Sequence, residues 1–155
     1  MMQVRPFKES DVDFCAQLAT SLPLGTRYGF TLEAWIQKLK SAQQEKDNLL
    51  FLAEEQGRIA GFFWAHRSGA FLSAPYLRFI AVSPDFQGRG VGTLLLKEFE
   101  QQTYSMGKDW FLLVSDFNTK AQLFYEKQGY QRVGVLPDFA KDGIAEIIMV
   151  KRYRS

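Results

Sequence analysis

The spacing of apolar residues changes several times along the chain, and each change marks a predicted element. Apolar positions recur every three or four residues after Ser10, after Thr31 and after Gly90, as on the buried face of an α-helix. Short apolar runs bounded by Gly, Pro, Asp or Ser are typical of β-strands. Strands are predicted at residues 3–6, 49–54, 59–67, 74–82, 110–115, 130–136 and 144–152. Helices are predicted from Ser10, with Asp13 as its partner in a partial capping box, to residues 22–25; after the Thr31 cap; at 90–104; and at 119–128, between an Asn118 cap and a stop at Gly129.

The predicted elements follow the order β-α-α-β-β-β-α-β-α-β-β. Residues 55–58 join two consecutive strands as a hairpin turn, so a purely parallel sheet is excluded. The strand-helix-strand unit from residue 74 to residue 115 predicts at least one parallel pair, because such a crossover returns to the same sheet. A mixed sheet with helices on both faces satisfies both requirements.

Composition fits one folded domain over residues 1–155 and argues against several classes of protein. Hydrophobic residues make up 46% of the chain and charged residues 23%, the usual mixture of a globular domain. A net charge of +2 does not indicate a nucleic-acid partner, and no apolar run approaches the ~20 residues that span a membrane. The single cysteine, Cys15, cannot form an internal disulfide bond; we expect a packed core thiol and a cytoplasmic protein.

Three glycines lie where a predicted strand is followed by a predicted helix, in residues 87–92 (QGRGVG). The first N–H groups of a helix have no intrahelical acceptor, and the helix dipole adds positive potential at the same end. Glycines also remove the Cβ atoms that would keep a ligand away from these N–H groups. Arg89 adds a guanidinium that can bind a phosphate through two hydrogen bonds. The segment therefore predicts a phosphate-binding loop.

Two common nucleotide-binding loops match this segment poorly. A nucleoside-triphosphate P-loop needs a lysine after its last glycine, and no lysine follows these glycines. A dinucleotide-binding loop needs the spacing GxGxxG; Gly88 and Gly90 supply the first two positions, but Thr93 stands at the third. The phosphate ligand is therefore expected to be of another kind.

Two segments carry a resemblance to a known family. Residues 87–92 fit the pattern Gln/Arg-x-x-Gly-x-Gly/Ala directly after a strand, and residues 118–130 (NTKAQLFYEKQGY) fit Asn-x-x-Ala-x-x-Phe/Leu-Tyr-x-x-x-Gly-Phe/Tyr. On these segments the chain resembles the GNAT superfamily of N-acetyltransferases, whose element order it also shares. The resemblance implies an α/β fold (α+β in some schemes) with a mixed, mostly antiparallel central sheet flanked by helices. It also implies acetyl-CoA as co-substrate, no metal, and a homodimer as one possible assembly.

The resemblance also assigns coenzyme contacts. The main chain of residues 80–82 would pair with the pantetheine arm, the glycine loop would hold the diphosphate, and Asn118 would contact the coenzyme near the pantetheine end. Tyr125 would stand beside the thioester sulfur as general acid, since a phenol with a pKa near 10 is protonated at neutral pH. The expected coenzyme-binding residues are Ile80, Ala81, Val82, Gln87, Gly88, Arg89, Gly90, Val91, Gly92, Thr93 and Asn118.

The general base is not identified by the motifs. Many peptide-N-terminal acetyltransferases of the family carry a Glu on the fifth strand, five residues before the Asn, and Leu113 occupies that position here. His66, the only histidine, ranks first among the replacements because of its ordinary pKa. Glu146 and Asp116 rank lower, and a water chain or an amine that arrives neutral would need no dedicated base.

The acceptor of the acetyl group is also left open. In the family the acceptor binds between the segment that joins the first two helices and the last hairpin. Arg27 could hold an acceptor carboxylate or phosphate there, and Asp138 and Asp142 could attract a cationic amine. Tyr28 and Phe30 could form apolar walls. These mixed charges do not distinguish a small-molecule amine from a peptide or protein amine.

The resulting hypothesis is a direct transfer of acetyl from acetyl-CoA to a primary amine in a ternary complex, with Tyr125 as general acid. The alternative from another class of protein is a non-catalytic acyl-CoA-binding sensor or partner module with the same fold. The missing acidic residue at Leu113 keeps this alternative open.

Overall fold

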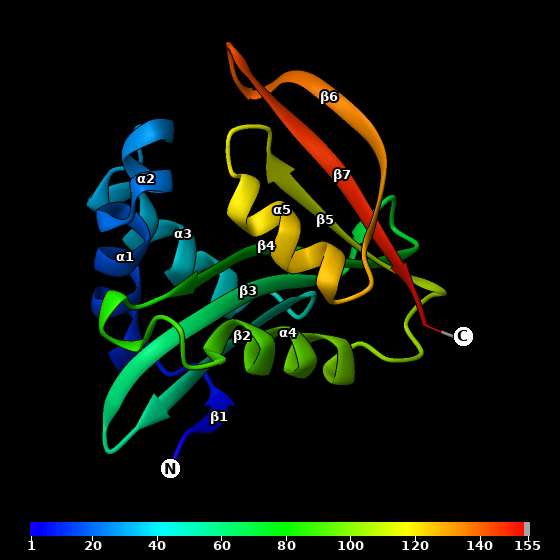
Figure 1. The fold of residues 1–155 in the computed structure, drawn as a ribbon. Coiled ribbons are helices and arrows are strands. Elements are labelled where there is room, and N and C mark those ends of the chain that lie inside the picture. Colours follow the sequence, from blue (N-terminus) through cyan, green and yellow to red (C-terminus); the bar gives the residue numbers. More distant parts are fainter. Residues whose placement is uncertain (154–155) are drawn as a thin grey trace.

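The computed structural model describes residues 1–153, which contain a seven-stranded sheet in the order β1-β2-β3-β4-β5-β7-β6 (Figure 1). All neighbouring strands are antiparallel except β4 and β5. The predicted mixed, mostly antiparallel sheet is therefore confirmed. The strands are β1 (Gln3–Pro6), β2 (Asn48–Glu55), β3 (Arg58–Ala70), β4 (Ala74–Val82), β5 (Asp109–Ser115), β6 (Gln131–Lys141) and β7 (Ile144–Arg152).

Helices cover both faces of this sheet, with α4 and α5 on one face and α1, α2 and α3 on the other (Figure 1). The two predicted caps form: Thr31 Oγ1 accepts the N–H of Ala34 at 3.3 Å, and Asn118 Oδ1 accepts the N–H of Ala121 at 3.2 Å. The helices are α1 (Val12–Ser21), α2 (Pro23–Tyr28), α3 (Leu32–Gln44), α4 (Val91–Gln102) and α5 (Thr119–Lys127). None of the helices in residues 1–153 combines the length and apolarity needed to cross a membrane.

Alternation along β3 divides the buried side chains between two cores. Phe62 and Trp64 pack in the core formed with α1 and α3, whereas Phe63 and Ala65 pack in the core formed with α4 and α5. Neighbouring side chains of a strand point to opposite faces, so a strand covered on both sides appears in the sequence as a continuous apolar run. Cys15 is fully buried in the α1 and α3 core, and burial raises the pKa of its thiol, as expected for a packed core cysteine.

Helix α2 is a correction to the sequence analysis, which predicts that residues 22–25 end the first helix and begin a loop. The chain instead starts a new helix at Pro23, whose fixed φ suits the first helical position. The helix ends at Gly29, whose φ of 72° places it in the left-handed conformation that commonly terminates helices. This short helix positions Tyr28 toward the centre of the molecule.

Several other boundaries differ from the prediction by one to five residues, and two of them have a clear cause. The N-terminal helical segment begins with a 3₁₀ turn at Glu9, and the carboxylate that accepts the N–H of Lys8 at 2.7 Å belongs to Asp11 rather than Asp13. β6 continues to Lys141, five residues beyond the predicted end, because its pairing with β7 resumes after an irregularity that follows Leu136. The last hairpin is therefore longer, and its turn is shorter, than the sequence indicates.

A β-bulge interrupts the pairing of β4 with β3. Leu77 pairs with Ala65 and Phe79 pairs with Trp64, so Arg78 has no partner on β3. The extra residue reverses the side-chain alternation: Leu77 packs in the α4 and α5 core, and Phe79 packs in the α1 and α3 core. Bulges bend the strand that contains them and often lie beside functional sites.

Candidate active site

β4 and β5 pair only near the bulge and then separate. Their parallel pairs are Tyr76 with Phe111 and Leu77 with Leu112. Past these pairs lie two pockets of about 390 and 670 Å³, here named the aromatic pocket and the glycine-loop pocket. The aromatic pocket includes Tyr28, Phe30, Trp35, Trp64, Tyr76 and Phe79, the glycine-loop pocket includes residues 80–82 and 90–93, and both share Leu24, Ile80, Asn118, Ala121 and Tyr125.

The start of α4 forms one wall of the glycine-loop pocket. The first N–H of this helix that bonds within it belongs to Leu94, which donates to the carbonyl of Gly90 at 3.1 Å. The preceding N–H groups, of Val91, Gly92 and Thr93, are left without an intrahelical acceptor. Gly88 and Gly90 have φ of 76° and 78°, and a Cβ at either position would meet no atom within 4 Å. The loop therefore presents unpaired donors and open space at the positive end of a helix, which suits a phosphate group.

Ten of the eleven expected coenzyme-binding residues line this pocket. They are Ile80, Ala81, Val82, Gln87, Gly88, Gly90, Val91, Gly92, Thr93 and Asn118. Residues 80–82 pair with β3 on one side, and their other edge is not paired with β5. An extended ligand could therefore add to this edge as a strand would.

Arg89 is the exception among the expected contacts. Its Nη2 lies 2.7 Å from both carboxylate oxygens of Glu55, and its guanidinium lies 5.3 Å from the ring centre of Phe86. These contacts hold the side chain against the β2–β3 hairpin rather than in the pocket wall. In this arrangement the glycine loop presents its main chain, not Arg89, to a ligand.

Two of the pocket residues have structural partners of their own. Gln87 Nε2 donates to the carbonyl of Val82 at 3.1 Å and so fixes the loop to the end of β4. Asn118 uses its side-chain oxygen to cap α5, which leaves its amide N–H groups as the donors that could reach a ligand.

Tyr125 lies in the wall that the two pockets share. Its side chain is only 6% exposed, and its ring packs edge-on against Phe124 and Tyr130 at centroid distances of 5.2 and 5.9 Å. Burial raises the pKa of Tyr125, so its hydroxyl keeps its proton at neutral pH. The residue can therefore serve as a proton or hydrogen-bond donor to a ligand that reaches either pocket.

A carboxylate enters the aromatic pocket from β7. Glu146 lies directly opposite Ser115 on β5 and is 6% exposed. Tyr28 Oη donates a hydrogen bond to Glu146 Oε2 and lies 2.6 Å from Ser115 Oγ. Burial is the main cause of a raised pKa at Glu146, and the nearby carboxylate of Asp116 raises it further. The pKa of Tyr28 rises to about 12 because of burial and this carboxylate, so Tyr28 remains the donor.

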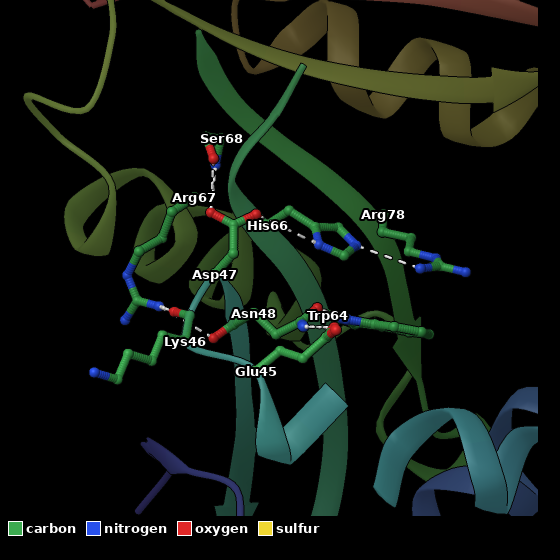
Figure 2. Close-up of polar contacts among 9 residues, drawn as sticks. All are labelled: Glu45, Lys46, Asp47, Asn48, Trp64, His66, Arg67, Ser68 and Arg78. Carbon is green, nitrogen blue, oxygen red and sulfur yellow. Dashed lines mark hydrogen bonds and ion pairs between the residues drawn. The ribbon is translucent and has the colours of Figure 1, made fainter. Parts of the chain in front are cut away.

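The ranking of candidate bases therefore changes. Leu113 lines the aromatic pocket. Glu146 lies on the neighbouring strand β7, opposite Ser115, which is two residues beyond Leu113 and on the same face of the sheet. His66 does not line either pocket; its ring lies between the side chains of Asp47 and Arg78 (Figure 2). Asp116 is exposed and accepts the N–H of Ala145 at 3.2 Å. Glu146, ranked low from the sequence, is the carboxylate that the fold brings into the pocket.

The expected acceptor residues are separated by the fold. Tyr28 and Phe30 line the aromatic pocket. Arg27 instead places its guanidinium 4.1 Å from the ring centre of Phe117, outside the pocket lining. Asp138 accepts the N–H of Gly143 at 2.6 Å within the last hairpin, and Asp142 lies in its turn.

The sequence analysis missed three polar residues of the aromatic pocket, Lys38, Arg78 and Ser115. Ser115 could have been assigned to the pocket from the sequence, because it lies two residues after Leu113 and alternate residues of a strand share a face. Lys38 follows Trp35 at helical spacing and could have been placed beside it. Arg78 carried no such signal, because the bulge that orients it depends on pairing with β3.

Comparisons with known proteins identify the family of the chain. A model of the acetyltransferase (GNAT) domain matches residues 25–153. An uncharacterized N-acetyltransferase from Methanocaldococcus jannaschii is 30% identical over 112 residues, which cover 68% of this chain and 67% of the relative.

Solved structures show the same fold. A protein from Desulfovibrio desulfuricans assigned to the GNAT acetyltransferases superposes with a TM-score of 0.83 at 22% identity, over 99% of this chain and 100% of the other. An aminoglycoside 6′-N-acetyltransferase in complex with coenzyme A has a TM-score of 0.79 at 18% identity, over 99% and 98% of the two chains. On the match to the family model and to the archaeal relative, the chain belongs to the GNAT family of acetyltransferases.

Proposed function

We propose that this protein transfers an acetyl group from acetyl-CoA directly to an amine bound in the same complex. The observation that carries the proposal is the position of Tyr125 in the wall shared by the two pockets. A coenzyme in the glycine-loop pocket and an amine in the aromatic pocket would meet beside this hydroxyl. A ternary complex of this kind needs no covalent enzyme intermediate, and the one cysteine is buried in the core away from both pockets.

Acetyl-CoA fits the glycine-loop pocket by its chemistry. Its diphosphate would accept hydrogen bonds from the free N–H groups of Val91, Gly92 and Thr93. Its pantetheine arm carries amide groups that can pair with the open edge of residues 80–82. This orientation would bring the thioester toward Tyr125 and Asn118, which lie where the pockets join.

The transfer then requires a base and an acid. Glu146 would accept a proton from the ammonium form of the acceptor, and the neutral nitrogen would attack the thioester carbonyl. The tetrahedral intermediate would break its carbon–sulfur bond, and Tyr125 would donate its proton to the departing sulfur. The nitrogen in the intermediate carries one proton too many, and it would release that proton through solvent as the amide forms, while Tyr125 would take up a proton from solvent to replace the one given to sulfur. The products are the amide and free CoA, and the proton held by Glu146 passes to solvent, so one proton is released per transfer.

An amine-panel assay tests the proposed function. Purified protein is incubated with acetyl-CoA and a series of small amines, amino acids and peptides, and release of the free CoA thiol is followed. Release above the background hydrolysis rate is expected for at least one amine. Tight acetyl-CoA binding by calorimetry with no release across the panel would instead support the non-catalytic coenzyme-binding module.

In the pH profile of kcat/KM, the fall in activity toward low pH (the acid limb) is expected to come from protonation of Glu146. Changing Glu146 to Gln should therefore remove this limb. A base acts in its deprotonated form, so activity should fall as the pH drops through the pKa of Glu146, which lies above the ordinary value of 4.5. Loss of a general base typically lowers the rate by about 10²- to 10⁴-fold. The profile is measured from pH 5 to pH 9 at saturating acetyl-CoA.

The matched control is Asp116→Asn. The Asp116 carboxylate raises the pKa of Glu146, and an Asn side chain can still accept the N–H of Ala145. This variant should keep its activity near neutral pH and move the acid limb to lower pH. An acid limb that is identical in the wild type and in Glu146→Gln would assign the limb to the amine and remove Glu146 from the mechanism.

A further inference from the structure

Two cations lie in the aromatic pocket together with Glu146. Lys38 Nζ lies 5.6 Å from the ring centre of Trp35, and Arg78 Cζ lies 3.9 Å from that of Trp64. The two indole rings are 5.9 Å apart and pack edge to face at 79°, so both cations lie against one pair of packed indole rings. Neither cation forms an ion pair with an acidic side chain within residues 1–153.

The charge of Arg78 affects the pKa of Lys38. Burial is the main cause of a lowered pKa at Lys38, and the charge of Arg78 lowers it further. Side chains that repel one another at a pocket wall favour the binding of an anion between them. Neither Lys38 nor Arg78 lines the glycine-loop pocket, so these two cations are not part of the wall that would hold the diphosphate.

The Arg78 side chain is held in position by its neighbours (Figure 2). The Trp64 ring beneath it is fixed by a hydrogen bond from Nε1 to Asn48 Oδ1 of 2.7 Å. On the other side, Arg78 Nη1 lies 3.4 Å from His66 Nε2, and His66 Nδ1 lies 3.8 Å from Asp47 Oδ2. Asp47 is itself fixed, because its Oδ1 accepts both the N–H and the hydroxyl of Ser68.

His66 supports this arrangement in its neutral form. Burial is the main cause of a lowered pKa at His66, and Arg78 adds to it more strongly than Asp47 opposes it. Near pH 7 the ring is therefore uncharged, and its Nε2 can accept a hydrogen bond from Arg78. A guanidinium that is oriented in advance loses less conformational entropy when it binds a ligand.

The same pocket carries negative charge from Glu146, whose hydrogen-bond partner is Tyr28 and not one of the two cations. Apolar side chains also line the pocket and include Phe30 and Phe79, whose rings lie 6.2 Å apart. The buried indole N–H of Trp35 also has no acceptor within residues 1–153. The pocket therefore combines one carboxylate, apolar walls and two cations that have no acidic partner within the described residues.

We propose that the acetyl acceptor is an amine that also carries an anionic group, joined to the amine by an apolar segment. The carboxylate or phosphate of the acceptor binds Arg78 and Lys38 at one end, while its amine lies beside Glu146 at the other. This inference rests on the proposed function and specifies the chemical class of its acceptor. It assigns to Arg78 the role that the sequence suggested for Arg27.

Pairs of amines, each with one anionic and one neutral member, test the proposal. The pairs are 6-aminohexanoate with hexylamine, 4-(aminomethyl)benzoate with benzylamine, and 6-aminohexyl phosphate with 6-aminohexanol. The anionic member of at least one pair is expected to have a kcat/KM about 10- to 100-fold higher, which corresponds to about 1.4 to 2.8 kcal/mol. Comparison of the carboxylate and phosphate pairs distinguishes the two anions.

Variants locate the anion site. Arg78→Met and Lys38→Met should each lower the preference for the anionic member, mainly through KM, and the double variant should bring the ratio close to one. Arg27→Met removes a nearby cation that does not line the pocket and should leave the ratio unchanged. Calorimetry with acetyl-CoA checks that each variant is folded.

The outcomes separate this inference from the proposed function. Equal rates for the charged and neutral members of every pair, or a preference that survives in the double variant, would overturn the assignment of the anion site while acetyl transfer stands. A preference that disappears in Arg27→Met but persists in Arg78→Met would move the site to α2. Absence of CoA release with every amine would instead reject the proposed function itself.

Discussion

Tyr125→Phe is expected to lower kcat by about 10²- to 10⁴-fold while acetyl-CoA still binds with its wild-type affinity. The change removes one hydroxyl and keeps the ring that packs against Phe124 and Tyr130. General acid catalysis contributes rate factors of about this size, which correspond to about 2.7 to 5.4 kcal/mol of barrier height. Turnover is measured as CoA release with the best acceptor from the panel, and coenzyme affinity is measured by calorimetry.

Tyr130→Phe is the matched control for this experiment. Tyr130 is also buried and touches the ring of Tyr125, but its hydroxyl donates to Glu100 at 2.8 Å and does not line either pocket. Because the acceptor is a carboxylate, loss of that hydrogen bond should cost about 1.5 to 3 kcal/mol of folding stability and leave turnover intact. Full activity in Tyr125→Phe, with the control behaving as expected, would show that the sulfur obtains its proton elsewhere.

This experiment also decides between the enzyme and the coenzyme-binding module. An enzyme that uses Tyr125 as its acid loses turnover in Tyr125→Phe and keeps its affinity for acetyl-CoA. A sensor has no turnover to lose, and the same substitution would leave its binding unchanged. The two functions therefore differ in whether the wild-type protein releases CoA and in whether loss of the Tyr125 hydroxyl lowers that rate.

Features that depend on local sequence were predictable. Helix α5 has its cap, Asn118, and its C-terminal glycine, Gly129, within its own segment, and both were identified correctly. The glycine loop is likewise local, because the free N–H groups of α4 follow from where the helix begins. For this reason most of the coenzyme-side residues named from the sequence line one pocket.

Features that depend on pairing between distant segments were not predictable. Glu146 acquires its place from its position opposite Ser115, and its hydrogen-bond partner Tyr28 is 118 residues away in the sequence. The sequence pattern around Tyr28 indicated a loop, whereas helix α2 places its hydroxyl beside Ser115 at the end of β5 and Glu146 near the start of β7. A search of the sequence near the motif position on β5 could not find this carboxylate, because it is supplied by β7, the strand that lies beside β5 in the sheet.

The bulge at Arg78 shows a second limit of sequence patterns. Strict alternation assigns Leu77 and Phe79 to the same face of β4, yet the two side chains pack in opposite cores. The alternation fails because one residue of β4 is left out of the pairing with β3, and nothing in the sequence of β4 alone marks that residue. The contact between Arg89 and Glu55 has the same origin, since it depends on how the β2–β3 hairpin approaches the loop.

Gly90→Glu is expected to weaken acetyl-CoA binding by at least about 100-fold, or about 2.7 kcal/mol. Gly90 lies in the left-handed conformation at the start of α4, and a Cβ there would point into open space beside the free N–H groups. A glutamate side chain would fill that space and bring a carboxylate that competes for the same donors. The affinity is measured by calorimetry at fixed ionic strength.

Gly143→Glu is the control that separates backbone strain from loss of the phosphate site. Gly143 has a φ of 86°, and a Cβ there would also meet no atom within 4 Å, so the same substitution has a similar backbone cost of about 1 to 2 kcal/mol. It lies in the β6–β7 turn, outside the glycine-loop pocket, and its variant should bind acetyl-CoA normally. Because the two variants share the added charge and the strained φ, only a site at the start of α4 explains a loss confined to Gly90→Glu. Equal affinity in both variants and the wild type would place the coenzyme diphosphate elsewhere.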